Sequence, residues 1–303
     1  MQTAARPVTP PANWRIRRRS EMGSGWHEWP LVLFTVLGQC VAGGLIVTGL
    51  AWFAGSQDER TRIVRAMFFL WVLMGIAFLA SVMHLGSPLR AFNSLNRLGH
   101  SPLSNEIASG SLFFAVGGLW WLVAALGKMP QTLGKIWLIV AMALGVLFIF
   151  AMTRVYQINT VPTWHNGYTT LGFFLTAFLG GPLLGALLLA GAGVAGPRAF
   201  AVVCVLALAV SLAAALMQSA GLAGIHSSVQ QASALLPDYG FWQAWRMVLL
   251  ALGIGCWLCP LARRVPPRPW GLAAGFALVL VGELIGRGLF YGLHMTVGMA
   301  VAG

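Results

Sequence analysis

Eight long apolar runs constrain the fold of this chain more than any other feature of its sequence. Each is close to the roughly 20 residues that an α-helix needs to cross a bilayer. Charged residues make up only 9% of the chain, whereas a soluble domain has about 25%. The sequence therefore predicts an all-α integral membrane protein, an eight-transmembrane-helix bundle embedded in the lipid bilayer. The predicted spans are Trp29–Phe53, Ala66–Leu85, Ile107–Leu126, Ile136–Val155, Leu171–Ala192, Phe200–Gly221, Phe241–Leu261 and Gly271–Tyr291.

The connections between these runs are short, so they leave no room for a separate soluble domain. We expect one transmembrane domain over residues 22–303, preceded by an extension over residues 1–21. We interpret the extension as disordered or as the product of an upstream start codon. A cleaved signal fits less well, because the apolar run that follows is long enough to span and no small-residue cleavage site is evident.

The charges in the loops predict the topology, because Lys and Arg favour the cytoplasmic side. The first, third, fifth and seventh loops hold nine of them, whereas the other loops hold only Arg90 and Arg97. Both termini are therefore predicted to face outward, which is periplasmic if the cell is Gram-negative and the membrane its inner membrane, although an arginine run at residues 15–19 opposes this. Scattered over short loops, the positive charges do not indicate nucleic-acid binding. The nine residues are Arg60, Arg62, Arg65, Lys128, Lys135, Arg198, Arg263, Arg264 and Arg268.

The segment from His84 to Glu106, HLGSPLRAFNSLNRLGHSPLSNE, is the strongest candidate for chemistry. It is densely polar and lies between two apolar runs, on the predicted periplasmic side. Ionisable groups at the edge of a hydrocarbon layer are costly, so they usually mark a place where protons, ions or a polar ligand are handled. Its polar residues include His84, Arg90, Asn93, Asn96, Arg97, His100, Asn105 and Glu106.

The last apolar run contains a second set of polar residues. Glu283, Arg287 and Tyr291 recur every four residues, so they share one face of the predicted helix. Glu at position i with Arg at i+4 is the favourable order for an intrahelical pair. We interpret the two charges as a structural ion pair. A functional role is the alternative, because their depth places them on the same side as His84.

The sequence predicts no haem, metal ion or iron–sulfur cluster in this chain. A b-type haem needs axial ligands, usually His, from spanning helices at matched depth, and all six histidines lie near the predicted outer ends of the spans. Cys256 and Cys259 have the spacing of a metal or redox motif, but no second pair accompanies them. Cys40 and Cys204 stand alone in apolar runs, as small buried residues commonly do.

Long strings in both loops and spans resemble a known family. From residue 22 to the C-terminus the chain is similar to the membrane anchor subunit of bacterial dimethyl sulfoxide reductase, whereas the first 21 residues have no counterpart. The strings are GSGWHEWPL (23–31), GQCVAGG (38–44), HLGSPLRAFNSLNR (84–97), LSNEIASGS (103–111), TVPTW (160–164), IHSSVQQ (225–231), PDYG (237–240) and GELIGRGLFYGLHMTVGMAVA (282–302).

The resemblance implies an anchor without haem that binds and oxidises menaquinol in a three-subunit enzyme. Electrons would pass to a ferredoxin-like iron–sulfur subunit and then to a molybdopterin catalytic subunit that reduces dimethyl sulfoxide or amine N-oxides. The quinol-site His and Glu of the family correspond to His84 in HLGSP and Glu106 in LSNE.

The chemistry of quinol oxidation fits these two residues, because the reaction releases two electrons and two protons. His has an unperturbed pKa of about 6.5, so it can accept a proton near neutral pH. We assign His84 to the first hydroxyl and Glu106 to onward proton release. Arg90 and Arg97 would hold Glu106 ionised or dock the cluster subunit. The remaining candidates for headgroup contacts are Asn93, Asn96, Asn105, Glu283, Arg287 and Tyr291.

Two other functions remain open from the sequence. An ion-translocating quinone-reactive subunit of the polysulfide reductase type would need a polar path to the cytoplasm, and the inner halves of the spans offer little beyond Gln39. A transporter without a redox role would be favoured if the protein worked alone. The terminal substrate would be selected by another subunit.

Overall fold

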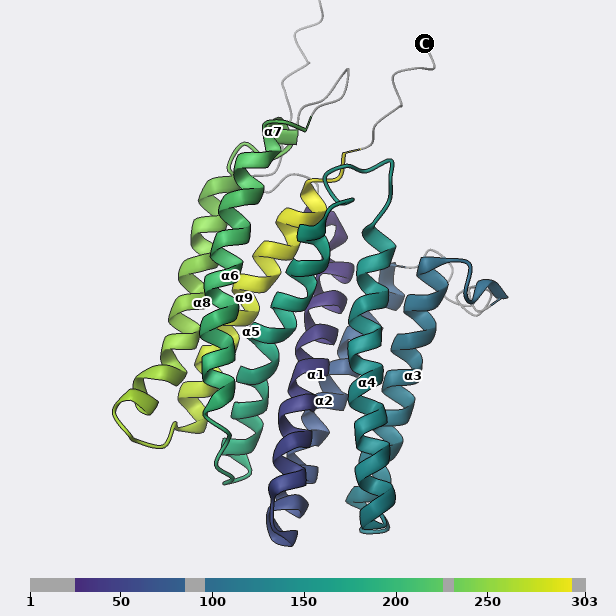
Figure 1. The fold of residues 1–303 in the computed structure, drawn as a ribbon, viewed down its shortest axis with the longest axis vertical. Coiled ribbons are helices and arrows are strands. Elements are labelled where there is room, and N and C mark those ends of the chain that lie inside the picture. Colours follow the sequence, from purple (N-terminus) through teal and green to yellow (C-terminus); the bar gives the residue numbers. More distant parts are fainter. Residues whose placement is uncertain (1–24, 85–95, 226–231, 296–303) are drawn as a thin grey trace, which may run out of the picture.

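The computed structural model describes residues 25–84, 96–225 and 232–295, and within these ranges the protein is helical without a β-strand. Eight long helices run up and down the molecule, which confirms the eight predicted spans (Figure 1). A single turn of 3-10 helix, η1 (Gly25–Glu28), precedes the first of them. A one-turn helix, α7 (Ala232–Leu235), lies between the sixth and seventh.

The long helices agree with the predicted spans to within a few residues, except at the start of the second. That helix begins nine residues before the predicted Ala66, because a polar stretch extends it beyond the apolar run. Asp58 and Glu59 in its first turn favour a helix start, since they complement the helix dipole. The helices are α1 (Trp29–Ala54), α2 (Gln57–His84), α3 (Pro102–Ala125), α4 (Gln131–Tyr156), α5 (Gly167–Gly191), α6 (Ala199–Leu222), α8 (Tyr239–Ala262) and α9 (Pro269–Gly292).

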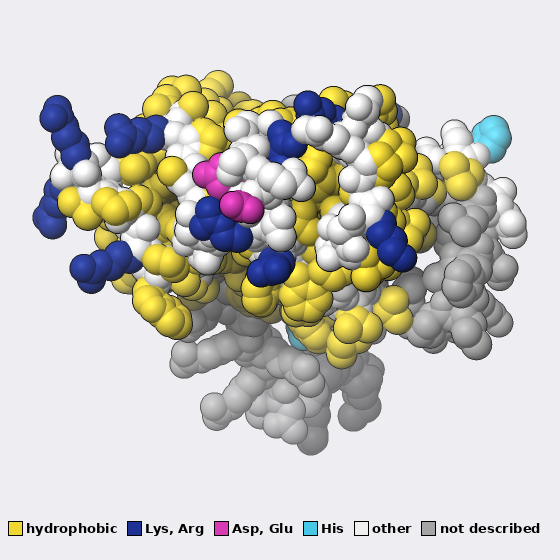
Figure 2. All heavy atoms as spheres, turned by 90° about the horizontal axis from the view of Figure 1, so that it is seen from below, with side chains coloured by type: hydrophobic (Ala, Val, Ile, Leu, Met, Phe, Trp, Pro, Cys, Tyr) yellow, Lys and Arg dark blue, Asp and Glu magenta, His cyan; other side chains and the backbone are white. Residues whose placement is uncertain are grey.

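The alternating helices give the bundle two ends with different charge. We call the end at which α1 begins and α9 ends the upper face, and the opposite end the lower face (Figure 1). The nine basic residues of the odd-numbered loops all belong to the lower face. Figure 2, which views the molecule from below, shows Lys and Arg side chains around the loops of this face. Among the described residues, the loops of the upper face contribute Arg97, and Arg154 lies in the last turn of α4.

The centre of the bundle is formed by α1 and α5, the two most buried helices. They approach closely where Gly43 meets Gly181. A Cβ on Gly43 would lie 2.5 Å from the Ala177 carbonyl oxygen, and a Cβ on Gly181 would lie 2.5 Å from the Gly43 Cα. Only glycine permits this approach, which is how small residues bring membrane helices together. Gly253 of α8 and Gly275 of α9 bring those two helices together in the same way.

The other helices pack on the two sides of this central pair. On one side, α9 and α6 contact α5, and α8 packs against both of them; on the other, α2 and α4 contact α1 and α3 packs against them (Figure 1). Glu106 therefore belongs to one side of the bundle, and the Glu283, Arg287 and Tyr291 set belongs to the other. Glu106 and these three residues can therefore approach one another only near the middle of the bundle.

Candidate functional site

Glu106 has an unsatisfied carboxylate oxygen inside the protein. Helix α3 starts after Ser101, whose hydroxyl caps it by accepting the Ser104 N–H at 3.5 Å. Glu106 follows in the second turn and is only 5% exposed, and among the described residues its Oε1 has no hydrogen-bond partner. A buried polar group without a partner is costly. Its oxygen is therefore available to a donor that the described part of the protein does not supply.

His84 is the last residue of α2, so it stands at the upper end of a helix that packs against α3. The structure describes its backbone only. Since Glu106 lies about one turn inside α3, the two residues are near the same face on neighbouring helices. These positions agree with the predicted end of the second span and start of the third.

The structure separates the remaining candidates of the 84–106 segment. Arg90 and Asn93 lie outside the described residues, and Asn96 and Arg97 are exposed just before α3. The Oδ1 atom of Asn105 accepts the Gly99 N–H at 2.7 Å. Asn105 therefore fixes the loop that leads into α3, a role that the sequence did not predict.

Two tyrosines, one at the end of α4 and one on the last span, meet near the upper face. Tyr156 ends α4 and Tyr291 lies in the last turn of α9, and their hydroxyl oxygens are 2.6 Å apart. Glu106 is near enough to interact electrostatically with both. The rings around them form what we call the aromatic cluster, which consists of Tyr156, Trp164, Phe173, Phe290 and Tyr291. Tyr291 is thus the candidate of the last span that approaches Glu106.

Arg287 lies one turn below Tyr291 and is held by neutral groups. Its guanidinium carbon is 3.5 Å from the centre of the Phe173 ring, a cation–π contact. Its Nη2 donates to Gln39 Oε1 at 2.9 Å and to Thr176 Oγ1 at 3.3 Å. The hydrogen bonds of Arg287 therefore connect α9 to α1 and α5.

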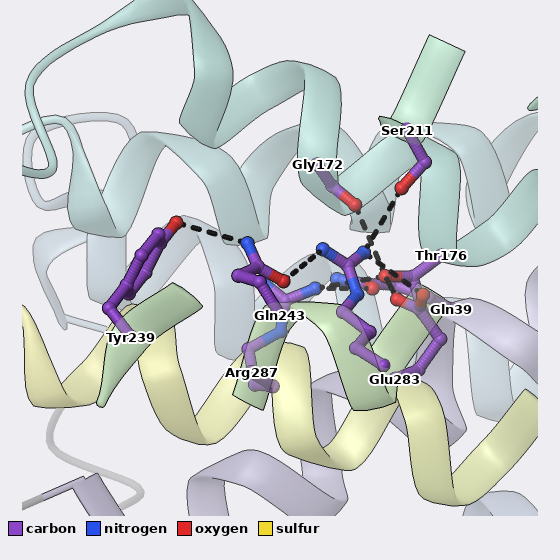
Figure 3. Close-up of polar contacts among 9 residues, drawn as sticks. Gln39, Gly172, Thr176, Ser211, Tyr239, Gln243, Glu283 and Arg287 are labelled. Carbon is purple, nitrogen blue, oxygen red and sulfur yellow. Dashed lines mark hydrogen bonds and ion pairs between the residues drawn. The ribbon is translucent and has the colours of Figure 1, made fainter. Parts of the chain in front are cut away.

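The predicted intrahelical pair between Glu283 and Arg287 is wrong. Among the described residues, the ion pair of Glu283 is formed with Arg246 of α8, whose Nη2 lies 3.0 Å from Glu283 Oε1. Arg246 reaches this position because Gly286 has no side chain: a Cβ there would lie 2.5 Å from Arg246 Nε. The Thr176 hydroxyl is bonded to the other oxygen of Glu283, so it connects the two arginines (Figure 3).

The polar network continues from Arg246 along α8 to Tyr239, the first residue of that helix. Figure 3 shows the contact between Gln243 and Tyr239. Arg246 Nη1 donates to Gln243 Oε1 at 3.5 Å, and Gln243 Nε2 donates to the Tyr239 hydroxyl at 3.0 Å. Arg246 Nη2 also donates to Ser211 Oγ of α6 at 3.4 Å. Most of these residues line a small pocket of about 60 Å³, which α5, α6, α8 and α9 enclose.

Sequence reasoning missed Arg246, Thr176 and Tyr156 as members of this region. Arg246 offered a usable signal, because a charge within an apolar run needs a partner. Thr176 offered none, since a hydroxyl in a spanning helix commonly bonds its own backbone. The described residues contain no group of three His, Cys, Asp or Glu side chains that could hold a metal ion.

Comparison with known proteins identifies the family. The sequence model of the DMSO reductase anchor subunit (DmsC) family matches residues 22–293. The protein is 67% identical over 284 residues to "Anaerobic dimethyl sulfoxide reductase chain YnfH" of Escherichia coli (strain K12), and the match covers 93% of this sequence and 100% of the relative. With the same coverage, it is 60% identical to a second anaerobic dimethyl sulfoxide reductase subunit of that strain and 44% identical to one from Haemophilus influenzae. The protein therefore belongs to the dimethyl sulfoxide reductase anchor subunit family.

Proposed function

We propose that this protein binds menaquinol near the upper face and oxidises it. It passes the electrons to an iron–sulfur subunit, which serves a molybdopterin reductase in anaerobic respiration. The family and the names of the E. coli relatives support a place in an anaerobic dimethyl sulfoxide reductase complex. The observation that carries the proposal is the buried Glu106 oxygen, which has no hydrogen-bond partner among the described residues.

The reaction divides between two acceptors. A quinol has two hydroxyl groups, and its oxidation releases one proton from each together with two electrons. His84 accepts the proton of the first hydroxyl, and Glu106 accepts the proton of the second and releases protons onward. The electrons leave for the cluster of the iron–sulfur subunit, so no haem or metal of this protein takes part. The exposed apolar side chains of α2 and α3, such as Met83 and Leu103, face the lipid from which the isoprenoid tail enters.

The distribution of charge supports an orientation in the membrane. The lower face carries the nine basic residues of the odd-numbered loops and belongs in the cytoplasm. The upper face, with the quinol site, then faces the periplasm, and both termini are periplasmic. The protein is a multi-pass protein of the bacterial inner membrane.

The buried polar groups argue against ion translocation. Such a function needs a polar path from the network around Glu283 to the lower face. In the lower half of the described bundle the buried polar side chain is Thr48, whose hydroxyl bonds the carbonyls of Gly44 and Leu45 in its own helix. The described network therefore ends about halfway across.

Turnover of the whole complex tests the proposal. His84→Leu removes the proton acceptor, so menaquinol-dependent reduction should fall by about 10²-fold or more, the usual size of a lost general base. Glu106→Gln keeps the shape and loses the proton site, so it should show a smaller loss. Activity with a dye that reduces the partner clusters directly should persist in both variants.

His165→Leu is the matched control, because His165 is an exposed histidine of the upper face on another loop. It should turn over menaquinol at the rate of the unmodified complex. Full menaquinol activity in His84→Leu, or loss of dye activity together with it, would show that His84 is structural.

A further inference from the structure

The lower half of the molecule contains a groove that the proposed reaction does not use. It lies between α2 and α5, with Phe276 of α9 also in its lining, and its volume is about 640 Å³. We call it the lower groove and define it by Arg62, Arg65, Phe69, Val72, Leu187 and Phe276. This volume lies within the roughly 300–1,000 Å³ of an ordinary small-molecule pocket.

The lower groove has the length of one leaflet of a bilayer. Along α2, Arg62 and Val72 are ten residues apart, which corresponds to about 15 Å of helix. This is half of the roughly 30 Å hydrocarbon core. Apart from the two arginines, the lining is apolar, and Phe69 and Val72 are exposed. An acyl chain that starts at the lower face would fit along it.

Two positive charges stand at the outer end of the groove. Arg62 Nη1 donates to the carbonyls of Ala192 at 3.0 Å and Gly193 at 3.1 Å, which fixes the guanidinium beside the end of α5. Arg65 follows one turn later and is exposed. The groove lining contains no Asp or Glu. Glu59 lies one turn before Arg62, but its Oε2 is bonded to the N–H and hydroxyl of Ser56.

We propose that the lower groove binds an anionic phospholipid. Its phosphate group lies at Arg62 and Arg65, and an acyl chain follows α2 and α5 to the depth of Val72. Guanidinium groups recognise phosphate oxygens through paired hydrogen bonds, whereas the neutral headgroup of a quinone offers no charge to match them. The groove lies in the half of the bundle opposite Glu106, so the proposal does not depend on the quinol chemistry.

Binding of labelled lipid to the delipidated whole complex tests this. Phosphatidylglycerol should bind the unmodified complex tightly, and Arg62→Gln combined with Arg65→Gln should weaken binding by about 30-fold, the effect of two surface charges. Arg65→Gln alone keeps the Arg62 contacts with α5 and should give a smaller loss. The zwitterionic phosphatidylcholine should bind more weakly, with little change between these variants.

Two further variants make the result decisive. Lys128→Gln with Lys135→Gln removes two exposed charges from the same face away from the groove, so it should leave binding unchanged. Leu187→Trp fills the groove and should weaken both lipids. Unchanged phosphatidylglycerol binding in the Arg62 and Arg65 double variant would overturn the proposal. Displacement of one bound phosphatidylglycerol by each menaquinone would also overturn the proposal, because it would indicate a second quinone site.

Discussion

At the scale of single residues, one network in the upper half of the bundle joins three charged side chains, two of them buried and one half-buried. Arg246 and Glu283 form the ion pair, with side chains only 12% and 2% exposed. Arg287 joins them through the Thr176 hydroxyl and places its guanidinium on the Phe173 ring. A buried charge is tolerated when it is paired, and the loss of one partner leaves the other uncompensated.

Replacement of Arg246 by Leu should therefore destabilise the protein by about 3–5 kcal/mol, because it leaves Glu283 without its ion-pair partner. A double variant, Arg246→Leu with Glu283→Leu, removes both charges and should recover most of this loss. Thermal unfolding of the purified complex measures both effects. The single variant Glu283→Leu completes the comparison. If the double variant lost as much stability as the summed losses of Arg246→Leu and Glu283→Leu, the two side chains would not be coupled.

At the scale of elements, close contact between glycines sets the distance between helices. Gly181→Ala should destabilise the bundle by about 1–3 kcal/mol, the usual cost of overpacking. The added Cβ would lie 2.5 Å from the Gly43 Cα, so α1 and α5 would have to separate. The yield of assembled complex in membranes, together with its thermal midpoint, measures the effect.

Gly118→Ala is the control for this change, because a Cβ at Gly118 on α3 would meet no atom within 4 Å. It should be neutral or slightly stabilising, since alanine favours a helix by about 0.5–1 kcal/mol over glycine. If Gly181→Ala and Gly118→Ala gave the same yield of complex and the same thermal midpoint, the α1–α5 contact would not limit stability.

At the scale of the whole molecule, the distribution of basic residues predicts the topology. A C-terminal alkaline phosphatase fusion should be active, because the enzyme folds only outside the cytoplasm and the last helix, α9, ends at the upper face, which we propose to be periplasmic. The same fusion on a protein that starts at Met22 should be equally active, since the resemblance and the family match both begin at residue 22. An inactive phosphatase paired with an active cytoplasmic reporter at the same position would reverse the orientation.

Local sequence was enough to predict the number of spans, their approximate ends and the separation of basic residues between the two faces. These features follow from composition, because a helix in lipid must satisfy its own backbone and carry about 20 apolar residues. The motif strings identified the family, and His84 and Glu106 drew attention through their position at the edges of apolar runs. None of these inferences required knowledge of how the helices pack.

Which side chains meet was settled by the packing of the helices. Spacing along the last span favoured a Glu283–Arg287 pair, but Arg246 of another helix takes Glu283, since Gly286 leaves room for it. Tyr156 approaches Tyr291 across 135 residues of sequence. The periodicity of one helix fixes which residues share its face, but it does not say which helix packs there. That choice depends on the close approaches at glycines, which exist only in the assembled bundle.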